Sequence, residues 1–142
     1  MQAAEQIDTL MSREQVLLDR MLYLAHTELA NMENGSDDSF PSYLEEAESI
    51  RELVDALEGK CDSLLPGAGV KDRAELLPDK TAHLRGTLEE LLRTDKRLNE
   101  LAVARLNLYK RELLNIRRSG KQISRYVNPF SMAGGVYIDT RK

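Results

Sequence analysis

Apolar positions recur every three or four residues through the second half of the chain. No proline interrupts them between Asp79 and Val127. This spacing places the side chains on one side of an α-helix. At 1.5 Å per residue such a helix would be roughly 70 Å long. The apolar stripe consists of Leu84, Leu88, Leu91, Leu98, Ala102, Tyr109, Leu113, Ile116, Ile123 and Val127.

A shorter helix is predicted at the start of the chain, from about Ala3 to Asn34. The Asn34-Gly35 pair can end it, because both residues tolerate a left-handed conformation. Glu14 and Glu28 interrupt its apolar stripe where a strict heptad would place apolar residues. The stripe consists of Ile7, Leu10, Met11, Leu17, Leu18, Met21, Leu22, Ala25, Leu29 and Met32.

A second short helix is predicted to begin at Ser42, which has the capping-box partner Glu45 three residues later. It ends near Pro66. Its packing seam has an unbroken alternation of three-residue and four-residue steps and contains Ala47, Ile50, Val54, Leu57, Cys61 and Leu64. A helical turn at residues 72–75 and a break at Pro78 precede the long helix.

Helices joined by short polar loops pack best as antiparallel neighbours. We therefore predict an all-α fold: an antiparallel helical bundle of three main helices, with one long C-terminal helix and a short irregular tail. Residues 1–127 form a single helical-bundle domain. The tail, residues 128–142, leaves the helical pattern at Asn128-Pro129 and contains Gly134-Gly135.

Composition agrees with long helices, since 42% of the 142 residues are apolar and there is no Trp. The net charge of −4 is unevenly distributed. Residues 1–66 carry 15 acidic and 4 basic side chains, whereas residues 93–142 carry 4 and 12. The two halves can attract each other within one bundle, or each can attract a partner.

A cytoplasmic location is expected. Cys61 is the only cysteine, so no intrachain disulfide can form, and its place in the seam predicts a small buried hydrophobe rather than a reactive thiol. The N-terminal residues lack an apolar core of signal-peptide length. No run of about 18 apolar residues exists, so no membrane insertion is expected.

Catalytic chemistry is not indicated. His26 and His83 have no second ligand at a metal spacing, and His83 is expected to form a surface pair with Asp79 on the same helix face. We predict that the protein is not an enzyme and has no catalytic, cofactor-binding or metal-ligating residues. The basic stretch from Lys110 to Arg125 is favoured as a solvated helix face, because the chain is acidic overall. No nucleic-acid partner is expected.

The length of the third helix suggests a binding surface. The first two helices would span roughly 48 Å and 36 Å, so the turns from about Glu112 to Val127 should lack partners from them. The apolar stripe nevertheless continues there. Either the tail around Tyr137 covers it or it is offered to another chain. The candidate partner-binding residues are Leu106, Tyr109, Leu113, Ile116, Ile123 and Tyr126.

The C-terminal third resembles the small flagellar export chaperones of the FliT and FlgN type. The residues that carry the resemblance are Ile116-Arg-Arg-Ser-Gly120-Lys-Gln-Ile123-Ser-Arg-Tyr126, Gly135-Val-Tyr-Ile138-Asp139, and upstream Leu91-Leu92-Arg-Thr-Asp95-Lys-Arg-Leu98-Asn99-Glu-Leu101. In such proteins a long helix commonly ends near a Tyr and is followed by a Gly-rich tail. The Tyr and the Ile138-Asp139 ending favour the FliT type, although the FlgN type stays open.

The resemblance implies a cytoplasmic chaperone of type III flagellar export. Such proteins bind a helical segment of an unassembled axial protein, either the filament cap or a hook–filament junction protein. They deliver this cargo to the export gate and its ATPase complex, and they use no cofactor. The alternative is a structural coiled-coil or dimerising interaction protein without a chaperone role, in which the protruding stripe pairs with its own copy in a homodimer.

Overall fold

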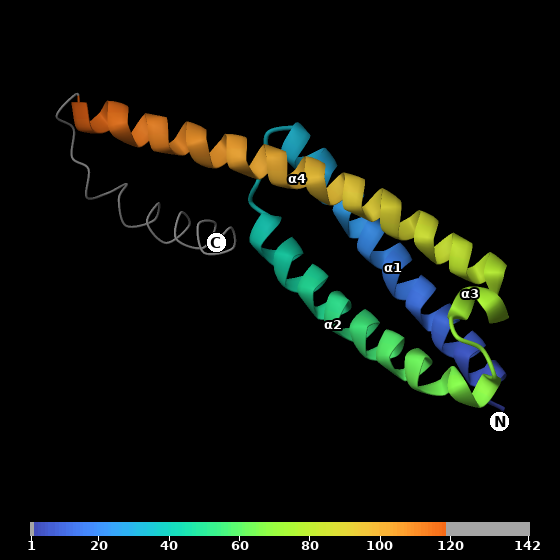
Figure 1. Cartoon of the computed structure of the whole chain (residues 1–142). Helices are drawn as coiled ribbons and strands as arrows, with labels where there is room; N and C mark the ends of the chain where they lie inside the picture. The colour runs from blue at the N-terminus through green and yellow to red at the C-terminus, as the bar shows by residue number, and fades with distance from the viewer. Residues whose placement is uncertain (1, 119–142) are drawn as a thin grey trace. The chain divides into compact units, whose positions relative to one another are not determined.

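The structure, a computed structural model, describes residues 2–118, and these are almost entirely helical (Figure 1). Helix α1 spans Ala3–Glu33, α2 spans Phe40–Leu64 and α4 spans Pro78–Arg118. A 3-10 turn, η1 at Pro66–Ala68, and a short helix, α3 at Arg73–Leu76, connect α2 to α4. The described residues contain no strand, so the prediction of an all-α fold is confirmed for them.

Two compact units divide the chain, Met1–Leu98 and Asn99–Lys142. The first, called unit 1 here, contains α1, α2, η1, α3 and the first half of α4. The described part of unit 2 is the second half of α4, residues 99–118. The predicted domain boundary between residues 127 and 128 lies outside the described residues and stays a prediction.

Heptad spacing governs burial in all three long helices of unit 1. Side chains repeating at steps of three and four lie on the inner faces, where they exclude water from the core. In α1 these buried residues are Ile7, Met11, Glu14, Leu18, Met21, Ala25, Glu28 and Met32. In α2 they are Phe40, Tyr43, Ala47, Ile50, Val54 and Cys61, and in α4 they are Leu84, Thr87, Leu91, Thr94 and Leu98.

The predicted stripes were wider than the buried faces. Leu10, Leu17 and Leu29 of α1 are only half-buried, whereas the two glutamates that interrupt that stripe are buried. In α4 the half-buried Leu88 lies beside the buried Thr87, whose hydroxyl donates a hydrogen bond to the carbonyl of His83 at 3.1 Å. A threonine can therefore occupy a core position, because the helix backbone satisfies its hydroxyl.

Polar contacts fix the direction of each helix in unit 1. In the contacts between α1 and α4, residues later in α1 pair with residues later in α4, so these two helices run in the same direction. In the contacts between α1 and α2, residues later in α1 pair with residues earlier in the chain near α2, so α2 is antiparallel to α1 (Figure 1). The α1–α4 contacts are Ser12–Lys80, Gln15–Thr87 and His26–Glu90, and the contacts of α1 with α2 and its N-cap are Arg20–Glu46 and Glu28–Ser39.

Helix α1 ends as the sequence predicts. Asn34 is its C-cap residue, and Gly35 adopts a left-handed backbone with φ of 94°. The Gly35 N–H donates to the carbonyl of Met32 at 3.0 Å and so satisfies one of the last carbonyls of the helix. A side chain at position 35 would be strained by this backbone conformation.

The N-cap residue of helix α2 lies three residues earlier than predicted, so the predicted capping role of Ser42 is wrong. Its N-cap residue is Ser39 and Pro41 lies in its first turn, where proline is tolerated because the N–H it lacks would be unsatisfied anyway. Phe40 is 2% exposed and stacks on Tyr43 with ring centroids 6.1 Å apart. Burial of this aromatic pair favours helix from Phe40 onward, and Ser42 is left exposed.

Replacing Ser39 with alanine should destabilise the protein by about 2 kcal/mol, because a buried carboxylate then loses a charge-assisted hydrogen bond. The Ser39 hydroxyl donates to Oε1 of Glu28 at 2.6 Å, and Glu28 is 3% exposed. Urea unfolding monitored by circular dichroism measures the change. Ser42→Ala is the matched control and should stay within about 0.5 kcal/mol of wild type. Equal effects of the two substitutions would contradict a stabilising role for the Ser39–Glu28 hydrogen bond.

The connection between α2 and α4 contains the predicted helical turn. Asp72 is the N-cap residue of α3, and its Oδ1 accepts a hydrogen bond from the Glu75 N–H at 2.9 Å. Helix α4 then starts at Pro78 itself, one residue before the predicted start. The connection thus places Arg73, the first residue of α3, against α1, as described below.

Candidate functional site

The candidate partner-binding residues within the described chain lie on the unit 2 half of α4. Leu106 is buried, with 7% of its surface exposed, whereas Tyr109, Leu113 and Ile116 are half-buried. These four residues are called the α4 stripe. Spacings of three and four keep them on one side of the helix. The other two candidates, Ile123 and Tyr126, lie outside the described residues.

Leucines also emerge from the sides of this helix segment. Leu108 and Leu114 are each 47% exposed, and both lie about 120° around the helix from the centre of the α4 stripe. Lys110 and Arg117, seven residues apart, lie along one edge of the stripe and are exposed. The segment therefore combines a half-buried apolar side with a positively charged margin, which suits an amphipathic helix with acidic flanks.

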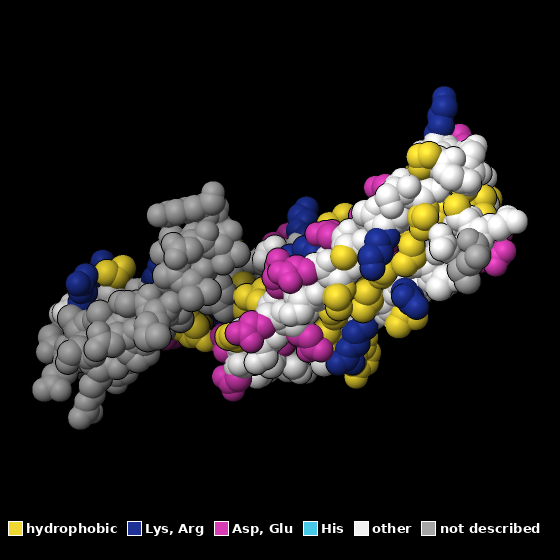
Figure 2. Space-filling model, turned by 90° about the horizontal axis from the view of Figure 1, so that it is seen from below, with side chains coloured by type: hydrophobic (Ala, Val, Ile, Leu, Met, Phe, Trp, Pro, Cys, Tyr) yellow, Lys and Arg dark blue, Asp and Glu magenta, His cyan; other side chains and the backbone are white. Residues whose placement is uncertain are grey.

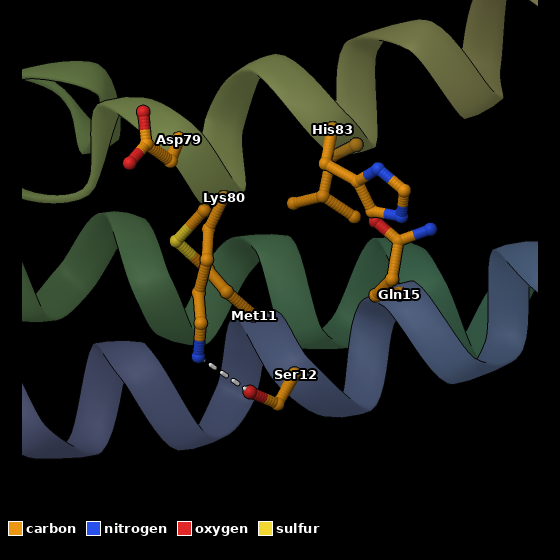
Figure 3. Close-up of a pocket in the computed structure, with 7 residues that line it drawn as sticks. Met11, Ser12, Gln15, Asp79, Lys80 and His83 are labelled. Atoms are coloured by element: carbon orange, nitrogen blue, oxygen red, sulfur yellow. Dashed lines mark hydrogen bonds between the residues drawn. The ribbon is translucent and has the colours of Figure 1, made fainter.

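A surface groove of about 340 Å³ runs between α1 and the start of α4 (Figure 3). Lys80 reaches across it to α1, where its ammonium donates to the Ser12 hydroxyl at 2.7 Å and pairs with Asp8. The His83 ring lies toward Gln15 while Asp79 points away, so the predicted Asp79–His83 pair is not formed (Figure 3). The polar groups of this groove hold α4 to α1.

A buried ion pair joins α3 to α1. The Glu14 side chain is 0% exposed, and Nη1 of Arg73 donates to its Oε1 at 3.0 Å. The Arg73 side chain is 23% exposed, so it extends from the surface into the core. Within the described residues no donor reaches the second oxygen of Glu14, Oε2. A buried carboxylate with one cation and one unsatisfied oxygen is an expensive arrangement.

A second carboxyl makes this cluster more negative. Glu58 of α2 lies close enough to hydrogen-bond to the Glu14 carboxyl when one of the two is protonated. Burial, opposed by Arg73 and reinforced by Glu58, raises the pKa of Glu14 above its ordinary value. The pKa of Arg73 is also raised: burial lowers it, but the adjacent Glu14 carboxylate outweighs burial. Glu14 therefore has one cationic partner, Arg73, and one like-charged neighbour, Glu58.

Glu14→Gln should flatten the dependence of stability on pH. A carboxyl whose pKa is raised by folding contributes stability that is present below its ordinary pKa and is lost as pH rises through the folded-state pKa. Wild type should therefore lose stability relative to Glu14→Gln as pH rises above about 4.5. Urea unfolding at pH 5 and pH 8 measures the difference. Glu52→Gln, an exposed control on α2, should keep the wild-type slope.

Cys61 lies beside this cluster and is fully buried. Burial raises the pKa of its thiol, and the nearby Arg73 only partly offsets this. The thiolate, which is the reactive form, is thus disfavoured. The prediction that Cys61 is a buried hydrophobe in the α2 seam is confirmed.

One further side chain, that of Tyr43, has a strongly shifted pKa. Burial, together with the negative charge of Asp95, raises the pKa of Tyr43 to about 12. Its phenol therefore stays protonated and can donate a hydrogen bond to Asp95 across the α2–α4 contact. Residues 2–118 contain no group of three or more His, Cys, Asp or Glu side chains placed to hold a metal ion.

Glu14 and Glu28 are visible in the sequence as interruptions of an apolar stripe, but their partners are not. Arg73 and Ser39 lie in connecting segments, and no spacing rule links them to α1. The signal that was available is the heptad position itself, because a charged residue at such a position must find a partner when it is buried.

No family model, curated protein or solved structure matches the chain. Within residues 2–118, no helix combines the length and the apolar character needed to cross a lipid bilayer.

Proposed function

We propose that this protein is a cytoplasmic flagellar export chaperone of the FliT or FlgN type. Its cargo is a helical segment of an unassembled axial protein, either the filament cap or a hook–filament junction protein. It passes this cargo to the export gate or its ATPase complex. It acts by binding alone, without catalysis or a cofactor.

The observation that carries the proposal is the α4 stripe. An apolar row continues at helical spacing through Leu113 and Ile116. Leu113 is only half-buried, so part of its side chain can still be covered by another apolar surface. Burying such a row against a second amphipathic helix is favourable, at roughly 25 cal/mol per Å² of apolar surface removed from water. Lys110 and Arg117 beside the row favour cargo helices with acidic flanks.

Unit 1 supports this role as a scaffold. We propose that α1, α2 and the first half of α4 form an antiparallel three-helix bundle, and that α4 is its long C-terminal helix, followed by a short irregular tail. The core contacts along the three heptads would keep α4 helical when cargo is absent. A preformed helix lowers the entropy cost of binding, because only the cargo segment must then become ordered.

The experiment is a direct titration. Fluorescently labelled C-terminal segments of the filament cap protein and of the junction proteins from the same organism are mixed with the purified full-length chain. Fluorescence anisotropy should show saturable binding of one class of segment, and that class distinguishes the FliT type from the FlgN type. If neither class binds at protein concentrations up to about 100 μM, weaker than −5.5 kcal/mol, the chaperone proposal is wrong.

A dimerising coiled-coil protein is the second candidate. The steps of three and four from Leu98 through Ile116 also suit pairing between two copies of α4. Sedimentation of the free protein tests it. A tight dimer that Leu113→Asp dissociates, together with no binding of either cargo class, would favour this candidate over a chaperone.

A further inference from the structure

A second groove lies in unit 1, between α2 and the first half of α4. Its volume is about 170 Å³, and its apolar lining comes from α1, α2 and α4. The lining residues Leu18, Met21, Val54 and Leu91 are buried, and Leu88 is half-buried. Leu92, which also lines the groove, is 68% exposed. An apolar floor beside an exposed leucine is typical of a surface that receives another apolar group.

Carboxylates surround this groove. Asp55 and Glu58 of α2 and Asp95 of α4 all line it. Arg51 is the only basic residue lining it within the described chain, and it already pairs with Glu48 at 2.6 Å. A space-filling view of one face shows apolar side chains in a row along the described helices, with both acidic and basic side chains beside them (Figure 2).

The Glu58 end of the groove connects with the buried cluster around Glu14. There the Glu58 carboxyl lies beside that of Glu14, Arg73 is the ion-pair partner of Glu14, and Oε2 of Glu14 has no donor among the described residues. When both carboxyls are ionised, this end of the groove therefore has an excess of negative charge. A cation brought to Glu58 from outside would compensate it at short range.

We propose that the α2–α4 groove is a docking surface for a basic amphipathic helix of another protein. Leucine-like side chains of that helix would lie on Met21, Leu88 and Leu92. Its lysines or arginines would pair with Asp55, Glu58 and Asp95. This is the helix-in-groove mode of recognition, in which apolar anchors supply affinity and charges set partner choice.

The chemistry of the groove argues against other classes of ligand. A nucleic acid or an anionic membrane would approach three carboxylates of its own sign. A drug-sized small molecule usually needs a pocket of roughly 300–1,000 Å³, which is larger than this groove. One or two apolar side chains of a helix fit such a volume, while the rest of the helix lies along the surface.

This surface is separate from the α4 stripe in both residues and charge. The stripe lies in unit 2 and has basic side chains along one edge, whereas the groove lies in unit 1 and is lined by acidic side chains. The two proposals can therefore fail independently. A protein with both surfaces can hold two helical partners of opposite charge, which is the arrangement of an adaptor.

The test uses two synthetic helical peptides, one of leucine and lysine and one with glutamate in place of every lysine. Fluorescence anisotropy measures their binding to the full-length chain at physiological salt. The lysine peptide should bind wild type, and Leu92→Arg and Asp55→Arg should each weaken it at least tenfold. The glutamate peptide should show no binding at the same concentrations.

Two matched variants control for the overall charge of the chain. Val16→Arg adds the same charge as Leu92→Arg at a residue that is also 68% exposed, and Asp38→Arg matches Asp55→Arg. Both controls should bind the lysine peptide as wild type does. Circular dichroism should show the same helicity in all four variants, since each substituted residue is exposed.

Three outcomes would overturn the proposal. The lysine peptide could fail to bind wild type, or it could bind Leu92→Arg as tightly as Val16→Arg, which would indicate general attraction to an acidic chain. Alternatively, sedimentation could show a dimer that Leu92→Arg dissociates, and then a second copy of the chain occupies the groove. Leu113→Asp should leave binding of the lysine peptide unchanged, so a failure here is separate from a failure of the chaperone proposal.

Discussion

Leu113→Asp should weaken cargo binding at least 100-fold, equivalent to about 2.7 kcal/mol, and leave the helical content of the protein unchanged. Leu113 lies on the α4 stripe and is half-buried, so a cargo helix on the stripe would cover it. A carboxylate there would have to be desolvated against apolar cargo side chains, with no donor to compensate it. Anisotropy titration of the labelled cargo segment measures the affinity, and circular dichroism measures the helicity.

The adjacent residue provides the control. Leu114 is 47% exposed and lies about 100° around the helix from Leu113, away from the α4 stripe. Leu114→Asp introduces the same charge into the same turn and should change cargo affinity less than threefold. If Leu113→Asp instead lowers helicity or unfolds the chain, Leu113 is ordinary core. If both substitutions weaken binding equally, the effect comes from charge alone and not from the stripe.

The helices of this protein could largely be read from the sequence. Steps of three and four residues recur because the helices bury one face each, and that requirement is visible as a pattern. The end of α1 was also predictable, because Gly35 supplies the left-handed backbone that ends it. The start of α2 was not, because stacking of Phe40 on Tyr43 outweighs the local capping signal at Ser42.

The width of each buried face was less predictable than its position. Leu88 and Thr87 are adjacent, and hydropathy alone assigns the leucine to the core. The heptad register places the threonine there instead, and its hydroxyl is satisfied by a carbonyl of its own helix. Register depends on all three helices together, so a single stripe does not determine it.

The candidate site could be located only in part. The sequence identified the apolar row of α4, and Leu113 and Ile116 keep that row at half-buried positions. The sequence did not show that Leu106 is buried while its neighbours along the row are half-buried, because burial depends on which side chains pack nearby. The α2–α4 groove was missed entirely, since its lining comes from three helices far apart in the sequence.

Arg73→Ala should destabilise the protein by about 3 kcal/mol at pH 8. Breaking a buried ion pair typically costs 3–5 kcal/mol, because the remaining charge stays buried without compensation. The lower value applies here, because the Arg73 side chain is 23% exposed and water can partly replace it. Urea unfolding monitored by circular dichroism measures the loss. Lys71→Ala, an exposed substitution in the same connection, should change stability by less than about 0.5 kcal/mol.

The effect of Arg73→Ala should depend on pH, because the carboxyl of Glu14 stays buried after the substitution. Without the guanidinium, burial and Glu58 act unopposed and raise the pKa of Glu14 further. The protonated carboxyl is neutral and tolerates burial, so the stability lost through Arg73→Ala should be smaller at pH 5 than at pH 8. Adding Glu14→Met to Arg73→Ala removes the buried charge and should recover most of the loss. If Arg73→Ala matches Lys71→Ala at both pH values, the pair does not hold α3 to α1, and the connection is positioned by its other contacts.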